Sequence, residues 1–224
     1  MRISEVRRLG TLSLVNFARK HAEKCGADPR PEVQARATTV GAAVRALEDS
    51  HAAYRPLRAL WEQATTIKDD ADDGVESVIR EISYDLLAPK LLNKERSDPR
   101  YRVLFPQGNL DFINGADRVQ VAHVRGMVKV LRDTPSHPMA DRAARLEAVN
   151  EAFDASLAPQ TAAESAFRAS ETLMRDQREA LYRTLRKSVT YLRDQLDGDE
   201  AAVEKLFPTV AEARVNDSDD TPGE

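Results

Sequence analysis

The feature that most constrains the fold of this chain is a pair of short motifs that each occur twice, in the same order. Residues 47–54 read Leu-Glu, four residues, then Ala-Tyr, and residues 146–153 read Leu-Glu, four residues, then Ala-Phe. Leu-Phe-Pro occupies residues 104–106 and again residues 206–208. Two motifs at nearly the same separation predict a tandem duplication of a unit of roughly 100 residues. That period is too long for a helical solenoid repeat, so we expect two similar modules.

Periodicity predicts that both modules are all-α. Good helix formers dominate the sequence, and alternation of Val, Ile and Thr at a period of two is nearly absent. Apolar residues instead recur at spacings of three and four, as in Val40, Val44, Leu47 and Tyr54. We therefore expect two tandem three-helix modules that form an antiparallel helical bundle.

The predicted boundaries follow the prolines and the acidic stretches. We expect a first helix over residues 4–24 and a second helix from near Pro31, which Pro56 either kinks or follows by opening a new helix as a first-turn proline. The acidic stretch 69–74 is expected to break the pattern and to lead into a third helix. A last long helix is expected over residues 181–196.

In each module the Leu-Phe-Pro motif is expected to close one end of the bundle, because proline ends a helix and the two apolar side chains can fold back into the core. The predicted domains are residues 1–106 for the first module and residues 110–208 for the second. Residues 209–224 are polar and acidic, and we expect a disordered tail there.

Composition indicates an ordinary helical protein of a reducing compartment. Apolar residues make up 42% and charged residues 31% of the 224 residues, and no apolar run is long enough to span a membrane. No secretory signal is recognisable at the start. The single cysteine, Cys25, excludes an internal disulfide, so we expect a cytoplasmic protein.

The charge is distributed unevenly along the chain. The net charge of −4 argues against a dedicated nucleic-acid binder. Residues 1–25 nevertheless carry six basic and two acidic side chains, whereas residues 197–224 carry nine acidic and two basic ones. Either this is a solvated tail beside an ordinary helix, or opposite ends of neighbouring chains attract each other.

His51 is the most suggestive single residue for metal chemistry. It follows Glu48 in a Glu-x-x-His pair, and di-iron helical bundles use two such pairs. The matching position of the second module is Asn150, so Glu147 lacks its histidine. We therefore expect His51 and Asn150 to be hydrogen-bonded core residues that fix helix register, with a mononuclear metal site as the alternative.

An acidic cluster offers a second metal hypothesis. Asp69, Asp70 and Asp73 match the spacing with which helical isoprenoid enzymes hold magnesium diphosphate, but the required second acidic site has no counterpart outside the predicted tail. The cluster also fails as an EF-hand loop, because Ala71 and Arg80 would stand at ligand positions. We expect a solvated helix start instead.

No phosphate-binding glycine loop, serine nucleophile elbow or paired Cys/His motif occurs. We therefore assign no catalytic, cofactor-binding or metal-binding residues and predict no cofactor.

The first hypothesis is a non-enzymatic helical protein that acts through protein–protein association, as a scaffold or assembly component and as a homo-oligomer. The alternative is a metal-binding bundle or metal-dependent enzyme that uses Glu48, His51 and the carboxylates from Asp69 to Asp73. A third hypothesis, nucleic-acid binding through the basic first helix, predicts steep salt dependence.

Overall fold

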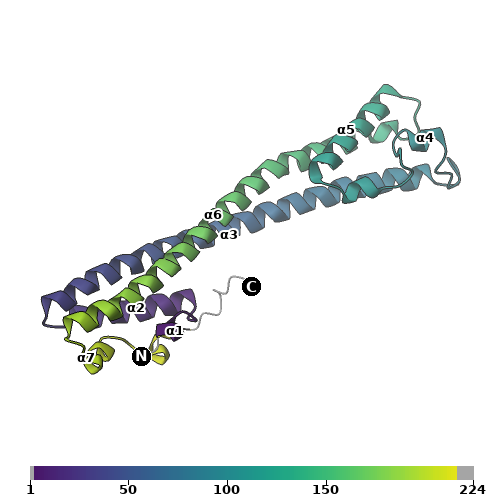
Figure 1. Cartoon of the computed structure of the whole chain (residues 1–224). Coiled ribbons are helices and arrows are strands. Elements are labelled where there is room, and N and C mark those ends of the chain that lie inside the picture. The colour runs from purple at the N-terminus through teal and green to yellow at the C-terminus, as the bar shows by residue number, and fades with distance from the viewer. Residues whose placement is uncertain (1–2, 216–224) are drawn as a thin grey trace. The chain divides into compact units, whose positions relative to one another are not determined.

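The computed structural model describes residues 3–215, and helices make up 78% of them. These residues contain no strand, so the predicted all-α class is confirmed. The elements follow one another as α1 (Ile3–Val6), α2 (Thr11–Gly26), α3 (Pro31–Leu86), α4 (Pro99–Arg102), η1 (Asp111–Asn114), α5 (Asp117–Asp133), η2 (Ala140–Arg142), α6 (Ala143–Gln195), α7 (Glu200–Lys205) and α8 (Val210–Ala213) (Figure 1). Across this described span, no helix is both long and apolar enough to cross a membrane.

Two helices, α3 and α6, are much longer than predicted. α3 continues through Pro56 and through the acidic stretch, so the predicted break at residues 69–74 is wrong, and no new helix opens at Pro56. α6 likewise continues through Pro159. A proline inside a helix removes one backbone hydrogen bond and crowds the preceding turn, so packing elsewhere along these helices must offset that cost.

Contacts from α5 explain why the acidic stretch stays helical. Gln120 donates from its amide nitrogen to Asp72 at 2.7 Å, and the Lys68 ammonium lies 3.5 Å from the Asp117 carboxylate. Desolvation raises the pKa of Asp72 and the Gln120 hydrogen bond opposes that rise. These partners are distant in sequence, so the local pattern of the acidic stretch does not reveal them.

The chain divides into two compact units that cut across the predicted modules. The first unit contains Met1–Leu57 and Phe167–Glu224, and the second unit contains Arg58–Ala166. Each unit therefore takes residues from both predicted modules, 1–106 and 110–208, and α3 and α6 each contribute to both units. The internal repeat stays a prediction about the sequence.

The first unit gathers α1, α2, α7 and α8 around the first part of α3 and the last part of α6 (Figure 1). The helix predicted over residues 4–24 is interrupted, because α1 ends at Val6 and α2 begins only after Gly10. Buried apolar side chains from α2, α3 and α6 fill the interior, among them Leu14, Phe17, Val33, Val40, Leu47, Leu181, Leu185 and Leu192.

The second unit packs α4, η1 and α5 against the last part of α3 and the first part of α6 (Figure 1). One apolar cluster fills it, including Ile79, Ile82, Tyr101, Phe105, Val124, Leu131, Leu146 and Phe153. The Tyr101 hydroxyl lies 2.9 Å from Ser83 Oγ, so this buried polar group is hydrogen-bonded.

Each unit contains one Leu-Phe-Pro motif, and the predicted burial of its Leu-Phe pair is confirmed. Leu104 and Phe105 are buried in the second unit, while Leu206 and Phe207 are buried in the first. The motif at residues 104–106 belongs to the first predicted module but lies in the second unit, together with α5 of the second predicted module. The motif at residues 206–208 belongs to the second predicted module but lies in the first unit, together with α2 of the first predicted module.

Part of the predicted tail is ordered. Residues 209–215 pack against α2: the side chain of Thr209 caps α8, and Asn16 Nδ2 donates to the carbonyl of Ala213 at 3.0 Å. The prediction of disorder from residue 209 is therefore wrong for this stretch. Ala213 is fully buried there, although the sequence has no apolar stripe that would predict its burial. Residues 216–224 lie outside the described part of the chain.

Candidate functional site

Both glutamates of the suspected metal motif are engaged by arginines. Arg19 on α2 forms an ion pair with Glu48, and Arg132 on α5 forms one with Glu147. His51 lies half-buried on α3, one turn after Glu48. Each of these carboxylates therefore already has a guanidinium partner.

Asn150, the counterpart of His51, is buried as predicted. Its amide nitrogen lies 3.4 Å from the Val121 carbonyl, which is a long hydrogen bond. Its oxygen Oδ1 is buried and has no hydrogen-bond partner among residues 3–215. Asn150 is thus only partly satisfied, in contrast to the fully hydrogen-bonded core residue that the sequence predicts.

The acidic cluster does not gather around a shared point. Asp69 lies 3.4 Å from the Lys68 ammonium, Asp72 accepts from Gln120, and Asp73 is exposed. Over the described part of the chain, no group of three or more His, Cys, Asp or Glu residues is arranged to hold a metal ion.

The densest polar network of the first unit centres on His21. A carbonyl oxygen can only accept, so Nδ1 carries the ring hydrogen and donates to Leu206 O at 2.8 Å. Nε2 then accepts from the Ser188 hydroxyl at 2.9 Å, and Arg36 Nε donates to the same Ser188 oxygen at 2.8 Å. The sulfur of Cys25 lies 3.7 Å from His21 Nδ1.

Burial governs the chemistry of this network. It lowers the pKa of His21 to about 4, with Arg36 and Lys24 acting in the same direction and the Leu206 carbonyl opposing them. Burial also raises the pKa of Cys25 to about 11, so its thiol stays protonated. Ser188 and His21 have the contact of a nucleophile and its base, but both are 0% exposed, so no substrate reaches them. The network is structural and fixes the segment after α7.

A related contact occurs in the second unit. His123 Nε2 lies 3.4 Å from Leu104 O, and its ring stacks on Phe112 with centroids 3.9 Å apart. As many residues separate His21 from His123 as separate Leu104 from Leu206. This equal spacing is the sequence signal that connects both histidines with the Leu-Phe-Pro motif, and the duplication itself stays a prediction. Considered one at a time, neither histidine belongs to a sequence motif that would mark it.

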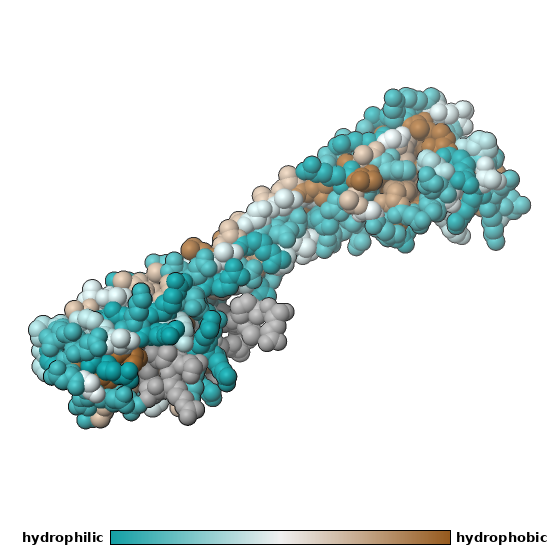
Figure 2. All heavy atoms as spheres, viewed as in Figure 1, coloured by the Kyte–Doolittle hydropathy of each residue, from teal (hydrophilic) through white to brown (hydrophobic). Residues whose placement is uncertain are grey.

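Exposed apolar side chains concentrate on the second unit. Figure 2 shows apolar residues in brown on its visible face, within a mostly polar surface. Six of the eight large apolar side chains that are exposed among the described residues belong to this unit, namely Leu60, Ile67, Tyr84, Leu91, Val103 and Val119. Leu60 and Ile67 are 55% and 54% exposed, and their spacing of two turns places them on one face of α3.

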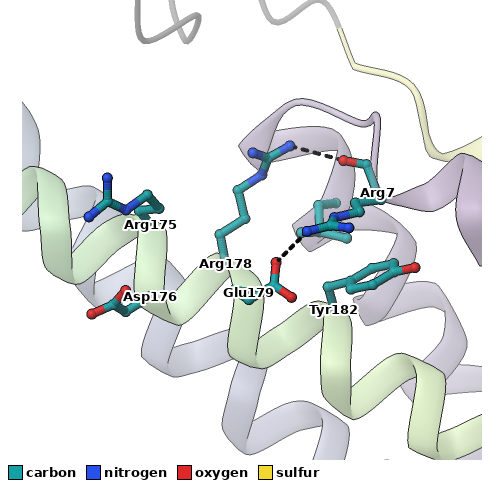
Figure 3. Close-up of a pocket in the computed structure, with 7 residues that line it drawn as sticks. Arg7, Arg175, Asp176, Arg178, Glu179 and Tyr182 are labelled. Atoms are coloured by element: carbon teal, nitrogen blue, oxygen red, sulfur yellow. Dashed lines mark hydrogen bonds and ion pairs between the residues drawn. The ribbon is translucent and has the colours of Figure 1, made fainter.

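The first unit carries a cavity of about 420 Å³ beside α6 (Figure 3). Three of its lining residues are arginines, Arg7 from the segment after α1 and Arg175 and Arg178 from α6, and we name it the arginine cavity. Arg178 donates to Leu9 O at 2.6 Å and to Arg7 O at 3.3 Å. Arg7 in turn lies 3.7 Å from the Glu179 carboxylate.

Sequence patterns do not reveal the arginine cavity, since Arg7 stands far from Arg175 and Arg178 in the chain. Of the candidates that the sequence motifs suggested, Glu48 pairs with Arg19 and Asp69 with Lys68. Glu48 and His51 belong to the first unit, whereas Asp69 belongs to the second. Comparison of the chain with protein families, with curated proteins and with solved structures gave no match. Function must therefore be inferred from the geometry alone.

Proposed function

We propose that this protein is non-enzymatic and acts through protein–protein association, as a scaffold or assembly component whose first partner is a second copy of the chain. The observation that supports this proposal is the concentration of exposed large apolar side chains on the second unit. Exposed apolar surface of this kind is used by many protein interaction sites, and Leu60 and Ile67 share one face of α3.

The face of α3 that carries Leu60 and Ile67 is suited to helix packing. Apolar residues seven apart form the seam of paired helices, and each such side chain stabilises an interface by roughly 1.5 to 3 kcal/mol when it becomes fully buried. Homo-oligomers are usually closed and twofold, so one such face would be used by both copies.

The metal-binding alternative has weaker support. Glu48 is held by Arg19, and Asp72 is held by Gln120. Glu48 and His51 also belong to the first unit, whereas the carboxylates from Asp69 to Asp73 belong to the second.

The proposal is tested by placing charges on this face of α3. We expect Leu60→Glu combined with Ile67→Glu to weaken self-association at least about 100-fold, which corresponds to about 3 kcal/mol. Sedimentation equilibrium measures the dissociation constant. Circular dichroism should show an unchanged helix content, because both side chains are exposed.

A matched control is available on the same helix. Ala59→Glu combined with Thr66→Glu adds the same charge at the same spacing, at exposed positions turned by about 100° around α3. This control should retain the association of the unmodified protein. If both double variants weaken it equally, or if the unmodified protein does not associate, the proposal is wrong.

A further inference from the structure

We propose that the arginine cavity binds a small molecule that carries an oxyanion group with two or more negative charges. This inference is independent of the proposed association, because the cavity belongs to the first unit and the exposed apolar residues concentrate on the second. The cavity volume of about 420 Å³ lies within the range of roughly 300 to 1,000 Å³ that is typical of small-molecule sites.

The arginines retain donors that no protein group uses. Within residues 3–215, Arg175 has no hydrogen-bond or ion-pair partner, and Arg178 uses only its Nη2 in hydrogen bonds, so its Nη1 donors are unused. Each guanidinium has five N–H donors in a planar fork that fits phosphate and carboxylate oxygens. Arg175 and Arg178 stand one turn apart on α6, so both can serve one ligand.

Arg178 is held by hydrogen bonds before any ligand arrives, and Arg7 is oriented by weaker contacts. Two backbone carbonyls, of Leu9 and Arg7, accept from the end of the Arg178 guanidinium. The Arg7 guanidinium lies over the Tyr182 ring, 5.6 Å from its centroid (Figure 3). A cation held in place loses little conformational entropy on binding, which favours affinity for a small anion.

Two carboxylates also line the cavity, but neither neutralises Arg175. Glu179 is turned toward Arg7, with which it pairs (Figure 3). Asp176 is drawn on the other side of α6 from Arg175 in that view. Three cations and two anions leave a local positive charge in a chain whose net charge is −4. Nonspecific attraction of anions by the whole protein is therefore not expected.

Phosphate groups and polycarboxylates share this chemistry, and titration calorimetry separates them. Pyrophosphate and citrate are each titrated at matched ionic strength into the full chain, into Arg175→Gln and into Arg183→Gln. Arg183 is exposed on the same helix and does not line the cavity, so it controls for loss of one positive charge.

We expect saturable one-to-one binding of at least one of the two anions, weakened at least tenfold by Arg175→Gln and unchanged by Arg183→Gln. The anion that binds more tightly identifies the class of ligand. Both variants should unfold at the same temperature as the unmodified protein without ligand, because among residues 3–215 neither Arg175 nor Arg183 makes a hydrogen bond or an ion pair that its replacement would break. Failure of both anions to saturate the protein at millimolar concentration, or equal weakening by both variants, would overturn the proposal.

Discussion

His21 shows how a single buried polar residue fixes the end of a helical unit. Its two ring nitrogens bind Leu206 O and Ser188 Oγ, and its ring stacks on Phe207 with centroids 3.8 Å apart. Every polar atom of the neutral ring therefore has a partner, which removes the cost of burying it. Protonation would add a charge where Nε2 must accept a hydrogen bond, so this arrangement requires the neutral form.

The low pKa of His21 predicts that acid destabilises the fold. Above pH 6.5 the ring is neutral in both states, whereas between the ordinary value of 6.5 and about 4 only the unfolded chain binds the proton. The unfolded state then gains protons that the folded state lacks, so the free energy of unfolding falls as pH decreases, by about 2 kcal/mol at pH 5. Urea unfolding at several pH values measures this fall.

His21→Gln isolates this contribution from that of the carboxylates. A glutamine amide can still donate to Leu206 O and accept from Ser188, but it does not titrate. The stability difference between the unmodified protein and the variant should shrink by about 2 kcal/mol from pH 7 to pH 5. A difference that stays constant with pH would show that His21 takes up protons equally in the folded and unfolded states.

Among the elements, the two long helices stand out because each contains an internal proline. Pro56 in α3 and Pro159 in α6 are exposed and leave one carbonyl of the preceding turn without its helical donor. Neither ends its helix, so tertiary packing decides the length of these elements rather than local propensity.

Pro56→Ala is expected to raise the free energy of unfolding by about 1 to 3 kcal/mol, because it restores the backbone donor and removes the clash with the preceding turn. Loss of proline rigidity in the unfolded chain reduces this gain by less than about 1 kcal/mol. Urea denaturation measures the change. Pro31→Ala is the control, since Pro31 begins α3 and its missing N–H would have no helical partner. If Pro56→Ala is neutral or destabilising, α3 has adapted to the proline.

The elements also show what sequence patterns can predict. The apolar stripe of Val40, Val44 and Leu47 is buried as expected, because spacing alone places these residues on one face. The continuity of α3 could not be predicted from the acidic stretch alone, since the partner of Asp72 is Gln120, 48 residues away in the sequence. The cavity arginines come from two segments that are far apart in the sequence, so no local motif marks them.

At the scale of the whole molecule, the two compact units mix the predicted modules. The first unit combines described residues from two separate stretches, 3–57 and 167–215, whereas the second is one continuous stretch, 58–166. Each unit pairs a short helix with a Leu-Phe-Pro motif through a histidine, and only the second unit exposes many large apolar side chains. The association that we propose would therefore use the second unit, whereas the histidine of the first unit belongs to a buried network.

The solution mass tests the central claim of association most directly. Light scattering over a range of protein concentrations, at low and at high salt, should give at least twice the chain mass of 24.9 kDa. An apolar interface on the second unit predicts that this species persists at high salt, because screening weakens charge pairs but leaves apolar burial intact. A mass of 24.9 kDa at both salt concentrations, even in the most concentrated samples, would contradict self-association, and dissociation at high salt would contradict an apolar interface.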